Sequence, residues 1–431
     1  MLFSKKTYSN PLFAKFKDWS KLLGATGGAQ ILVQAIGFIS GILIIRILPT
    51  DEYAIYTLAN TMLGTMVILS DGGISAGVLS QSAGVWQDKK KLGQVLNTGF
   101  DLRKKFAIAS LLVSVPILLY LLRNIDVNWY VAIIVVIALI PAFISKLSFS
   151  LLVSPAKVRQ DILPLQKNDL EINFTRIALL LASIFVFPFA FVAILVAGIS
   201  QIWGNYRLRK VIKPYVDFTQ EQSAEVKKNI LKIVYRTLPE SIYYCISGQI
   251  TIWILAVFGS TSSLAEIGAL SRIALLLSLI TVMFKTLIVP RYARLKNDFN
   301  LIFKRFVTIQ FLLLLVFSVF LLAVFLFSDQ ILWILGPKYS NFNKEILLVM
   351  LGSSLNLFSG LTFSTCVSRG WVINPLISIP LSIFTMICCV MVFDVSTLYG
   401  VLLFNIVIAL VHAIMNSTYG FIKVFKLKEI S

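Results

Sequence analysis

The sequence has few charged residues. Only 14% of its 431 residues are Asp, Glu, Lys or Arg, whereas 58% are hydrophobic and the mean hydropathy is +0.86. A soluble domain carries about 25% charged residues, so this chain lacks the polar surface that a soluble protein of its length needs. Much of its surface must therefore face lipid, where only helices and closed β-barrels satisfy their own backbone. The apolar runs are continuous rather than alternating, which favours helices.

Acidic residues, histidine and cysteine are also scarce. The chain has 20 Asp and Glu against 39 Lys and Arg, one histidine and four cysteines. The cysteines lie inside apolar runs without metal-type spacing, so we expect no metal site: Cys245, Cys366, Cys388 and Cys389. The sequence also lacks the G-x-x-x-x-G-K-[ST] loop that cradles ATP and the H-E-x-x-H and G-x-S-x-G motifs. These absences predict a protein that is not an enzyme and holds no cofactor.

Apolar runs of about 20 residues recur along the chain and predict twelve transmembrane helices. We expect them at residues 22–47, 53–80, 106–122, 129–153, 170–187, 189–206, 237–258, 264–290, 306–328, 344–367, 372–393 and 397–420. The first run is too long for a signal peptide and has no evident cleavage site. Pro188 interrupts the block 170–206, which predicts a tight hairpin there. The predicted fold class is an all-α integral membrane protein.

Lysine and arginine are distributed unevenly between the predicted loops. Most lie in the segments that share a side with both termini: 1–21, 84–105, 154–176, 204–236, 290–305, 368–374 and 421–431. The opposite side has only Lys338 and Lys344, with Arg46 and Arg123 at span ends. By the positive-inside rule this places both termini in the cytoplasm. The net charge of +19 then serves orientation and contact with anionic lipids, and it predicts no nucleic-acid partner.

The longest polar stretch, 207–236, divides the predicted spans into six and six. Six spans return the chain to its starting side, so the two halves have the same orientation, as parallel repeats do. The turn before the second span has Glu52 and then Ala54, and the turn before the eighth has Glu266 and then Gly268, at the same offset. Acids at these positions also stabilise a helix N-terminus. The predicted units are a first bundle (1–206), a cytoplasmic linker (207–236) and a second bundle (237–431).

Four stretches resemble the polysaccharide-exporter branch of the multidrug/oligosaccharidyl-lipid/polysaccharide exporter superfamily. They are RILPTDEYAIY (46–56), LSDGGISAGV (69–78), GQVLNTGF (93–100) and GPKYSNFNKEI (336–346). This branch contains the Wzx-like flippases for O-antigen and teichuronic acid. The resemblance implies two six-helix bundles around a central cavity, in the cytoplasmic membrane of a bacterium. It also implies alternating-access transport of a polyprenyl-diphosphate-linked oligosaccharide, with other polysaccharide-assembly proteins as partners.

Cations within or at the ends of the predicted spans are candidates to bind this substrate. They are Arg46, Lys146, Arg272 and Lys285. A Lys or Arg at the bilayer centre costs roughly 2.5–3.5 kcal/mol, so each needs a partner, a wet cavity or a side chain that reaches the interface. Guanidinium and ammonium groups suit a diphosphate. An exporter of cationic drugs would place acids in its cavity instead.

Two other titratable residues leave an alternative open. Asp71, followed by Gly72 and Gly73, can pair with a cation or bind a coupling ion, and His412 is either a proton relay or a packed side chain. If Asp71 faces the cavity, the alternative is a cation-coupled exporter of small molecules. A membrane enzyme that ligates polysaccharide is a third class. Such an enzyme would have a large outer loop rich in arginine and histidine. The longest predicted outer loop, about 328–343, is short and has no histidine.

Overall fold

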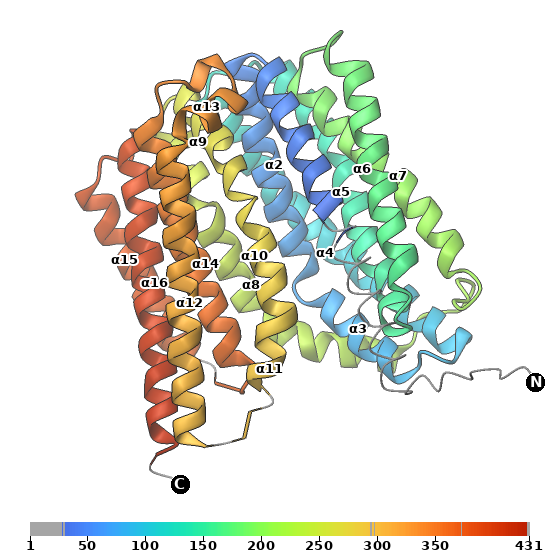
Figure 1. The fold of residues 1–431 in the computed structure, drawn as a ribbon. Coiled ribbons are helices and arrows are strands. Elements are labelled where there is room, and N and C mark those ends of the chain that lie inside the picture. Colours follow the sequence, from blue (N-terminus) through green and yellow to red (C-terminus); the bar gives the residue numbers. More distant parts are fainter. Residues whose placement is uncertain (1–27, 29–30, 294, 297, 372, 429–431) are drawn as a thin grey trace, which may run out of the picture.

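The computed structural model describes residue 28 and residues 31–428 except 294, 297 and 372, and all regular elements of this part are helices (Figure 1). A helix at Ile31–Ile47 comes first. In the first half of the chain it is followed by α2 (Thr50–Asp71), α3 (Ile74–Gly84), α4 (Lys89–Asn124), α5 (Trp129–Val158), α6 (Ile162–Ile184) and α7 (Ala190–Ile212). The second half contains α8 (Ala224–Phe258), α9 (Thr261–Ala274), α10 (Leu277–Met283), η1 (Phe284–Ile288), α11 (Val289–Ala293), α12 (Phe299–Leu326), α13 (Ser328–Leu335), η2 (Pro337–Tyr339), α14 (Asn343–Val367), α15 (Pro375–Val392) and α16 (Leu398–Lys426).

Eight helices of the described part are long and apolar enough to cross a membrane: α2, α4, α5, the second part of α8, α12, α14, α15 and α16. Many large apolar side chains on them point outward, among them Leu112, Phe311 and Phe384, as a lipid-facing surface requires. The all-helical membrane class is thus confirmed. The predicted count of twelve spans and their arrangement in two bundles stay predictions, because α6 and α7 carry more polar residues and the eighth predicted span is divided into α9, α10, η1 and α11.

The hairpin predicted at Pro188 is present. Helix α6 ends at Ile184 and α7 begins at Ala190, where the backbone N–H donates to a carboxylate oxygen of Glu52 over 2.7 Å. Glu52 lies in the first turn of α2, where the sequence predicts that an acid stabilises the helix N-terminus. Its carboxylate also caps the N-terminus of α7. This contact joins two distant segments at one end of the molecule.

The predicted span 53–80 is wrong as a continuous helix, because α2 ends at Asp71 and α3 starts at Ile74. Gly72 and Gly73 have φ angles of 46° and 100°, in the left-handed region that glycine adopts at low cost. A Cβ on Gly73 would overlap the hydroxyl of Thr237, which donates to the Gly72 carbonyl over 3.0 Å. The two glycines thus turn the chain and admit α8 at close range.

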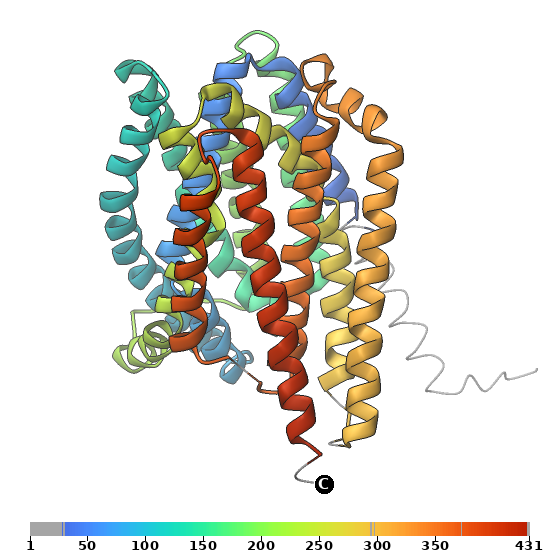
Figure 2. The ribbon, with the colours of Figure 1, turned by 90° about the vertical axis from the view of Figure 1, so that its left-hand side faces the viewer.

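The upper end in Figure 1 carries α13, and the lower end carries the end of α16. At the upper end, α2 packs on α9, and a Cβ on Gly268 of α9 would overlap Thr57 of α2. At the lower end, the first turns of α8 pack on α3 and α4. Figure 2 shows α12, α15 and α16 as long, roughly parallel helices on one side of the molecule.

The predicted linker 207–236 is largely helical. It contains the end of α7, the loop 213–223 and the first turns of α8, where the Ser223 hydroxyl accepts from the backbone N–H of Val226. Inside the loop, Asp217 accepts hydrogen bonds from the backbone and hydroxyl of Thr219 and from the amide of Gln220. These bonds lower the pKa of the Asp217 carboxyl. The division into two bundles around this segment stays a prediction.

Candidate functional site

Three cations of the predicted spans or their edges lie near one another between helices of both halves of the chain. They are Lys146 of α5, Arg176 of α6 and Arg272 of α9, and we call them the cation cluster. Arg176 lies within electrostatic range of Arg272, and Lys146 lies within range of Arg176. Helices from both halves of the chain therefore bring like charges to one place.

Arg272 is held beside two phenols of α2. Its guanidinium carbon lies 5.7 Å from the ring centre of Tyr56, and Tyr53 lies next to it. Both tyrosines are buried, with exposed fractions of 1% for Tyr53 and 9% for Tyr56. An arginine over an aromatic ring gains about 2 kcal/mol when the pair is desolvated. The phenols thus stabilise the guanidinium without neutralising its charge.

The helix Ile31–Ile47 makes room for both arginines with two glycines. A Cβ on Gly41 would lie 3.5 Å from Cδ of Arg272, and one on Gly37 would lie 3.8 Å from Nη2 of Arg176. Residues four apart lie on the same face of a helix, so this one face borders both side chains. A bulkier residue at either position would push an arginine away from the cluster.

The side chain of Lys146 is accessible to solvent, although the residues beside it on α5, Ser145 and Leu147, are buried. Ile144, which has an exposed fraction of 54%, lies two residues before it, a rotation of about 200° around the helix. Lys146 therefore points away from the face that carries Ile144, toward the interior that Arg176 occupies.

No acid neutralises the cation cluster within the described part of the chain. The ion pairs there join other residues, and none includes Lys146, Arg176 or Arg272. Like charges in a medium of reduced dielectric constant repel each other, and buried charges are normally paired. An arrangement of this kind is suited to an anion, which would neutralise the cluster when it binds.

Arg46, a predicted substrate-binding residue, lies apart from the cluster at the upper end. Its Nε donates to the Ile334 carbonyl over 2.9 Å, and its Nη2 donates to the Trp333 carbonyl. These carbonyls end α13, where the helix dipole favours a cation. The guanidinium carbon also lies 5.3 Å from the centre of the Trp333 ring. In this conformation Arg46 links the first helix to α13.

Lys285 and His412 line one cavity of the second half. Its volume is about 350 Å³. Lys285 is exposed there, on the π-helical turn η1, and Nε2 of His412 lies 2.7 Å from Oγ of Ser382. The structure thus brings together these two predicted residues, but places neither in the cation cluster. The predicted roles in binding and coupling stay predictions.

Asp71, the predicted coupling residue, is engaged in an ion pair with Arg103 of α4. Arg103 has an exposed fraction of 3% and also donates to the Leu147 carbonyl over 2.7 Å and to the hydroxyls of Ser75 and Ser150. The Ser75 hydroxyl donates to Asp71 over 2.6 Å. This network holds α4 and α5 to the break between α2 and α3, so Asp71 has a structural role in this conformation.

Two of these interior arginines were missed by reasoning from sequence. Arg103 and Arg176 were assigned to predicted cytoplasmic segments, but α4 runs from Lys89 and α6 from Ile162, so both arginines lie within long helices. The polar residues around them reduced the local hydropathy and moved the predicted span boundaries. The available signal was helical continuity, because no proline or glycine separates Arg103 or Arg176 from the apolar run that follows.

The sequence matches no known family profile and no curated protein. Solved structures do resemble it. A multidrug resistance MATE family transporter of the MOP superfamily in its inward-facing conformation has a TM-score of 0.73 and 15% sequence identity, with 92% of this chain and 96% of that chain covered. An outward-facing transporter of the same description has a TM-score of 0.61 and 14% identity, with 94% and 96% covered. A MATE protein in the bent conformation has a TM-score of 0.62 and 16% identity, with 94% of each chain covered.

The chain therefore has the fold of these membrane transporters. The likeness covers nearly the whole chain, 92% of it in the inward-facing structure. The polysaccharide-exporter branch within the superfamily is not distinguished by the likeness, because identities of 14–16% carry the fold alone.

Proposed function

We propose that this chain is a membrane exporter that works by alternating access and carries a lipid-linked oligosaccharide through its diphosphate. Its site would be the cation cluster, where Arg272 and Arg176 bind the phosphate oxygens and Lys146 adds a third charge. Guanidinium groups form paired hydrogen bonds with phosphate oxygens. The substrate would move from the cytoplasmic to the outer leaflet of a bacterial cytoplasmic membrane, with both termini in the cytoplasm and polysaccharide-assembly proteins as partners.

The observation that carries this proposal is the unneutralised charge of the cation cluster. Three clustered cations with no acid partner among the described residues favour an anionic substrate over a cationic one. A cationic drug would be repelled there, whereas a diphosphate would neutralise the site. Tyr53 and Tyr56 add phenol donors at the same place.

Rescue of a bacterium that lacks its own oligosaccharide flippase tests the proposal. The wild-type chain should restore surface polysaccharide, and Arg176→Gln with Arg272→Gln should not, because the variant loses both guanidinium groups. The matched control is Lys304→Gln with Arg305→Gln, two exposed cations at the start of α12, which should rescue fully. Full rescue by the cluster variant at equal expression would refute the proposed site.

A second candidate is a cation-coupled exporter of small molecules. Two of the three similar structures named above are described as multidrug resistance transporters and none as a polysaccharide flippase, so the likeness itself favours this candidate over the first. Asp71 would be its coupling carboxylate. Resistance profiling against a panel of cationic and neutral drugs, with and without Asp71→Asn, decides between the two. Resistance conferred by the wild-type chain supports the drug exporter, and its loss in Asp71→Asn at an equal amount of folded protein would assign coupling to Asp71.

A further inference from the structure

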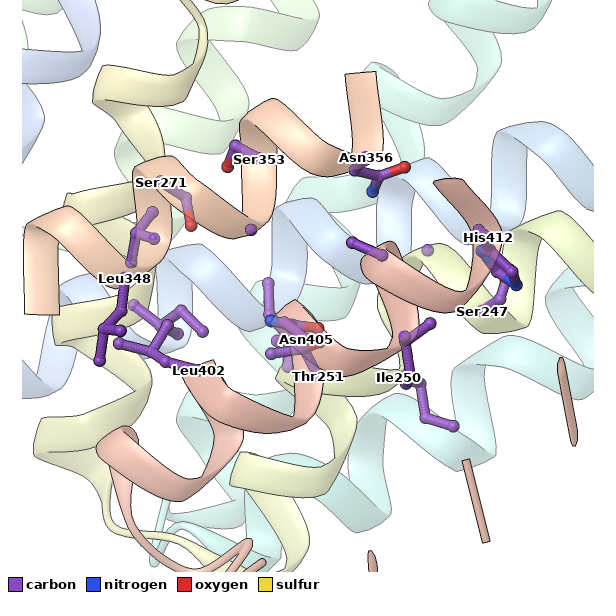
Figure 3. Close-up of a pocket in the computed structure, with 17 residues that line it drawn as sticks. Ser247, Ile250, Thr251, Ser271, Leu348, Ser353, Asn356, Leu402, Asn405 and His412 are labelled. Carbon is purple, nitrogen blue, oxygen red and sulfur yellow. Dashed lines mark hydrogen bonds between the residues drawn. The ribbon is translucent and has the colours of Figure 1, made fainter. Parts of the chain in front are cut away.

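The second half of the chain contains two adjoining cavities. The upper one, of about 300 Å³, lies between α8, α9, α14 and α16 (Figure 3). The lower one is the cavity of about 350 Å³ that Lys285 lines. Asn356 and His412 line both, so the cavities adjoin, and we call them together the neutral pocket. Binding sites for small ligands have volumes of roughly 300–1,000 Å³, which each cavity reaches.

Glycines in the middle of two helices keep this space open. Gly248 of α8 lines the upper cavity and Gly360 of α14 lines the lower one. A Cβ built on either would meet no other atom within 4 Å. Membrane helices commonly use glycine for close packing, but close packing does not explain glycine at these two positions. Glycine also weakens a helix relative to alanine, so the empty volume calls for another explanation.

The polar groups that face the neutral pocket are almost all uncharged. The upper cavity is lined by the hydroxyls of Thr251, Ser271 and Ser353 and the amides of Asn356 and Asn405, and neither cavity is lined by an acid. Lys285 is the one lysine or arginine among the lining residues of the two cavities. The pocket therefore lacks the charge to select an ion, but it is rich in groups that both donate and accept hydrogen bonds.

Several of these groups have bonding capacity left over. Thr251 donates to Oδ1 of Asn405 over 2.6 Å, and the amide nitrogen of Asn405, which lines the pocket, has no recorded acceptor among the described residues (Figure 3). In the described part of the chain, Ser271, Ser353 and Asn356 make no side-chain hydrogen bond within the protein. An apolar ligand would leave such groups unpaired, at a cost in affinity. A ligand with many hydroxyl groups can pair with them, because a hydroxyl also donates and accepts.

The neutral pocket adjoins the cation cluster through one helix. Ser271 lines the upper cavity, and the next residue, Arg272, belongs to the cluster. Consecutive residues of an α-helix point about 100° apart, so α9 presents a hydroxyl to one region and a guanidinium to the other. A single ligand with an anionic group joined to a polyhydroxyl group could contact both.

We infer that the neutral pocket is a binding subsite for the uncharged sugar residues nearest the diphosphate of the transported lipid. This inference rests on the proposed function, since the cation cluster would hold the diphosphate. Asn356 and Asn405 bind sugar hydroxyls through their amides, and Gly248 and Gly360 leave the volume that the sugar rings occupy. The pocket thus contributes affinity for the glycan, and the cluster contributes affinity for the carrier.

Binding measurements on the full chain in lipid nanodiscs test this subsite. The probes are undecaprenyl diphosphate alone and a set of undecaprenyl diphosphates that each carry one neutral hexose or N-acetylhexosamine. We expect at least one glycosylated lipid to bind the wild-type chain about tenfold more tightly than the bare carrier, as one or two added hydrogen bonds would give. Gly248→Leu and Gly360→Leu fill the pocket and should abolish that gain while leaving bare-carrier affinity unchanged.

Matched variants separate the outcomes. Gly84→Leu is the control, because a Cβ there also meets no atom within 4 Å but lies outside both cavities; it should bind like wild type. Asn356→Leu, nearly isosteric, should lose the sugar gain without filling the pocket. The inference is overturned if no sugar adds affinity, or if the leucine variants weaken both lipids equally. Failure of the proposed function looks different: the bare carrier then binds the wild type and the Arg176→Gln, Arg272→Gln variant alike.

Discussion

The cation cluster and the neutral pocket lie on two sides of α9 and hold opposite kinds of polar group. The cluster gathers Lys146, Arg176 and Arg272 without an acid partner among the described residues. The neutral pocket gathers hydroxyl and amide groups around open volume. Charge inside a membrane protein costs free energy unless it is paired or used, whereas hydroxyls and amides cost little when they face a wet cavity. The two regions therefore suit two different parts of one amphiphilic substrate.

A second contrast lies within the charged residues themselves. Arg103 is buried, and Asp71 pairs with it while three further oxygen atoms accept its hydrogen bonds. Among the described residues, Arg272 has two phenols beside it but no carboxylate. Pairing with a carboxylate gives Arg103 a structural role in this conformation, whereas the lack of a carboxylate partner among the described residues is the reason to propose Arg272 as a binding residue.

The largest effect should come from removing charge from the cluster. Arg272→Gln should lower the rate of lipid flipping about 100-fold, and Arg272→Lys about tenfold, because an ammonium group keeps the charge but not the paired geometry. Initial rates in proteoliposomes with a fluorescent undecaprenyl-diphosphate-linked oligosaccharide measure this. Arg305→Gln, an exposed arginine of α12, should match wild type. Equal rates for Arg272→Gln, Arg272→Lys and Arg305→Gln would contradict a role of the cation cluster in transport.

Breaking the paired arginine should act on stability first. Asp71→Asn leaves Arg103 buried without its carboxylate, and we expect a loss of about 3 kcal/mol in the free energy of unfolding, at the lower end for a broken buried pair. Asp71 is 30% exposed, which limits the cost. Denaturant unfolding in detergent micelles measures it. The pair Asp71→Leu with Arg103→Leu should recover most of the stability.

Transport by the double leucine variant then separates structure from coupling. If Asp71 serves structure alone, the double variant transports at nearly the wild-type rate. A stable double variant that binds substrate but no longer transports would instead assign coupling to Asp71, and it would bring the second candidate function forward.

A smaller effect is expected at the upper end. Arg46→Gln removes the guanidinium from the α13 carbonyls and from Trp333, and we expect about a fivefold rise in the population open at that end, the equivalent of roughly 1 kcal/mol. Distances between spin labels at Tyr130 and Gln330, both exposed, report the opening. The control is Arg123→Gln, because the recorded interactions of Arg123 are local: it donates to the Val127 carbonyl and lies over the Trp129 ring. Equal opening in both variants would exclude a specific link through Arg46.

The smallest effect concerns pH and the loop before α8. Hydrogen bonds from Thr219 and Gln220 lower the pKa of Asp217 below its usual value of 3.8. A carboxyl whose pKa is depressed by folding contributes stability above its unfolded pKa and loses it as pH falls toward the folded value. The protection of amides in the loop 213–223 against hydrogen exchange, relative to the intrinsic rate at each pH, should therefore fall below about pH 4. Asp217→Asn should remove this pH dependence of the protection. A protection that depends on pH equally in Asp217→Asn would contradict the role of Asp217 in stabilising the loop.

The sequence predicted the membrane class because its evidence is spread over hundreds of residues. Hydropathy and the low charge fraction identified long helices, and proline identified the turn at Pro188. It failed at Gly72 and Gly73, where an apolar run continues through a break that depends on α8 crossing from a distant part of the chain. No local pattern reports such a contact.

The site was predictable only in part, because local sequence patterns show a cation within an apolar run but not its distant contacts. Arg272 and Lys146 stood out as cations within apolar runs, whereas Arg176 directly follows the polar first part of α6 and was counted as a loop cation. Arg46 also stood out, but its link to α13 depends on a contact across 288 residues. The neutral pocket gave no sequence signal, because isolated serine, asparagine and glycine residues are ordinary in membrane helices.

Equilibrium binding of undecaprenyl diphosphate to the wild type and to the Arg176→Gln, Arg272→Gln variant in nanodiscs tests the central claim most directly. Binding of a cationic dye to the same nanodiscs is measured as well, because the dye represents the substrate class of the second candidate function. Loss of two charged hydrogen-bonding groups should weaken lipid binding about 100-fold or more, and the dye should bind no better than to empty nanodiscs. Unchanged lipid affinity in the variant, or specific binding of the dye with no binding of the lipid, would contradict the account.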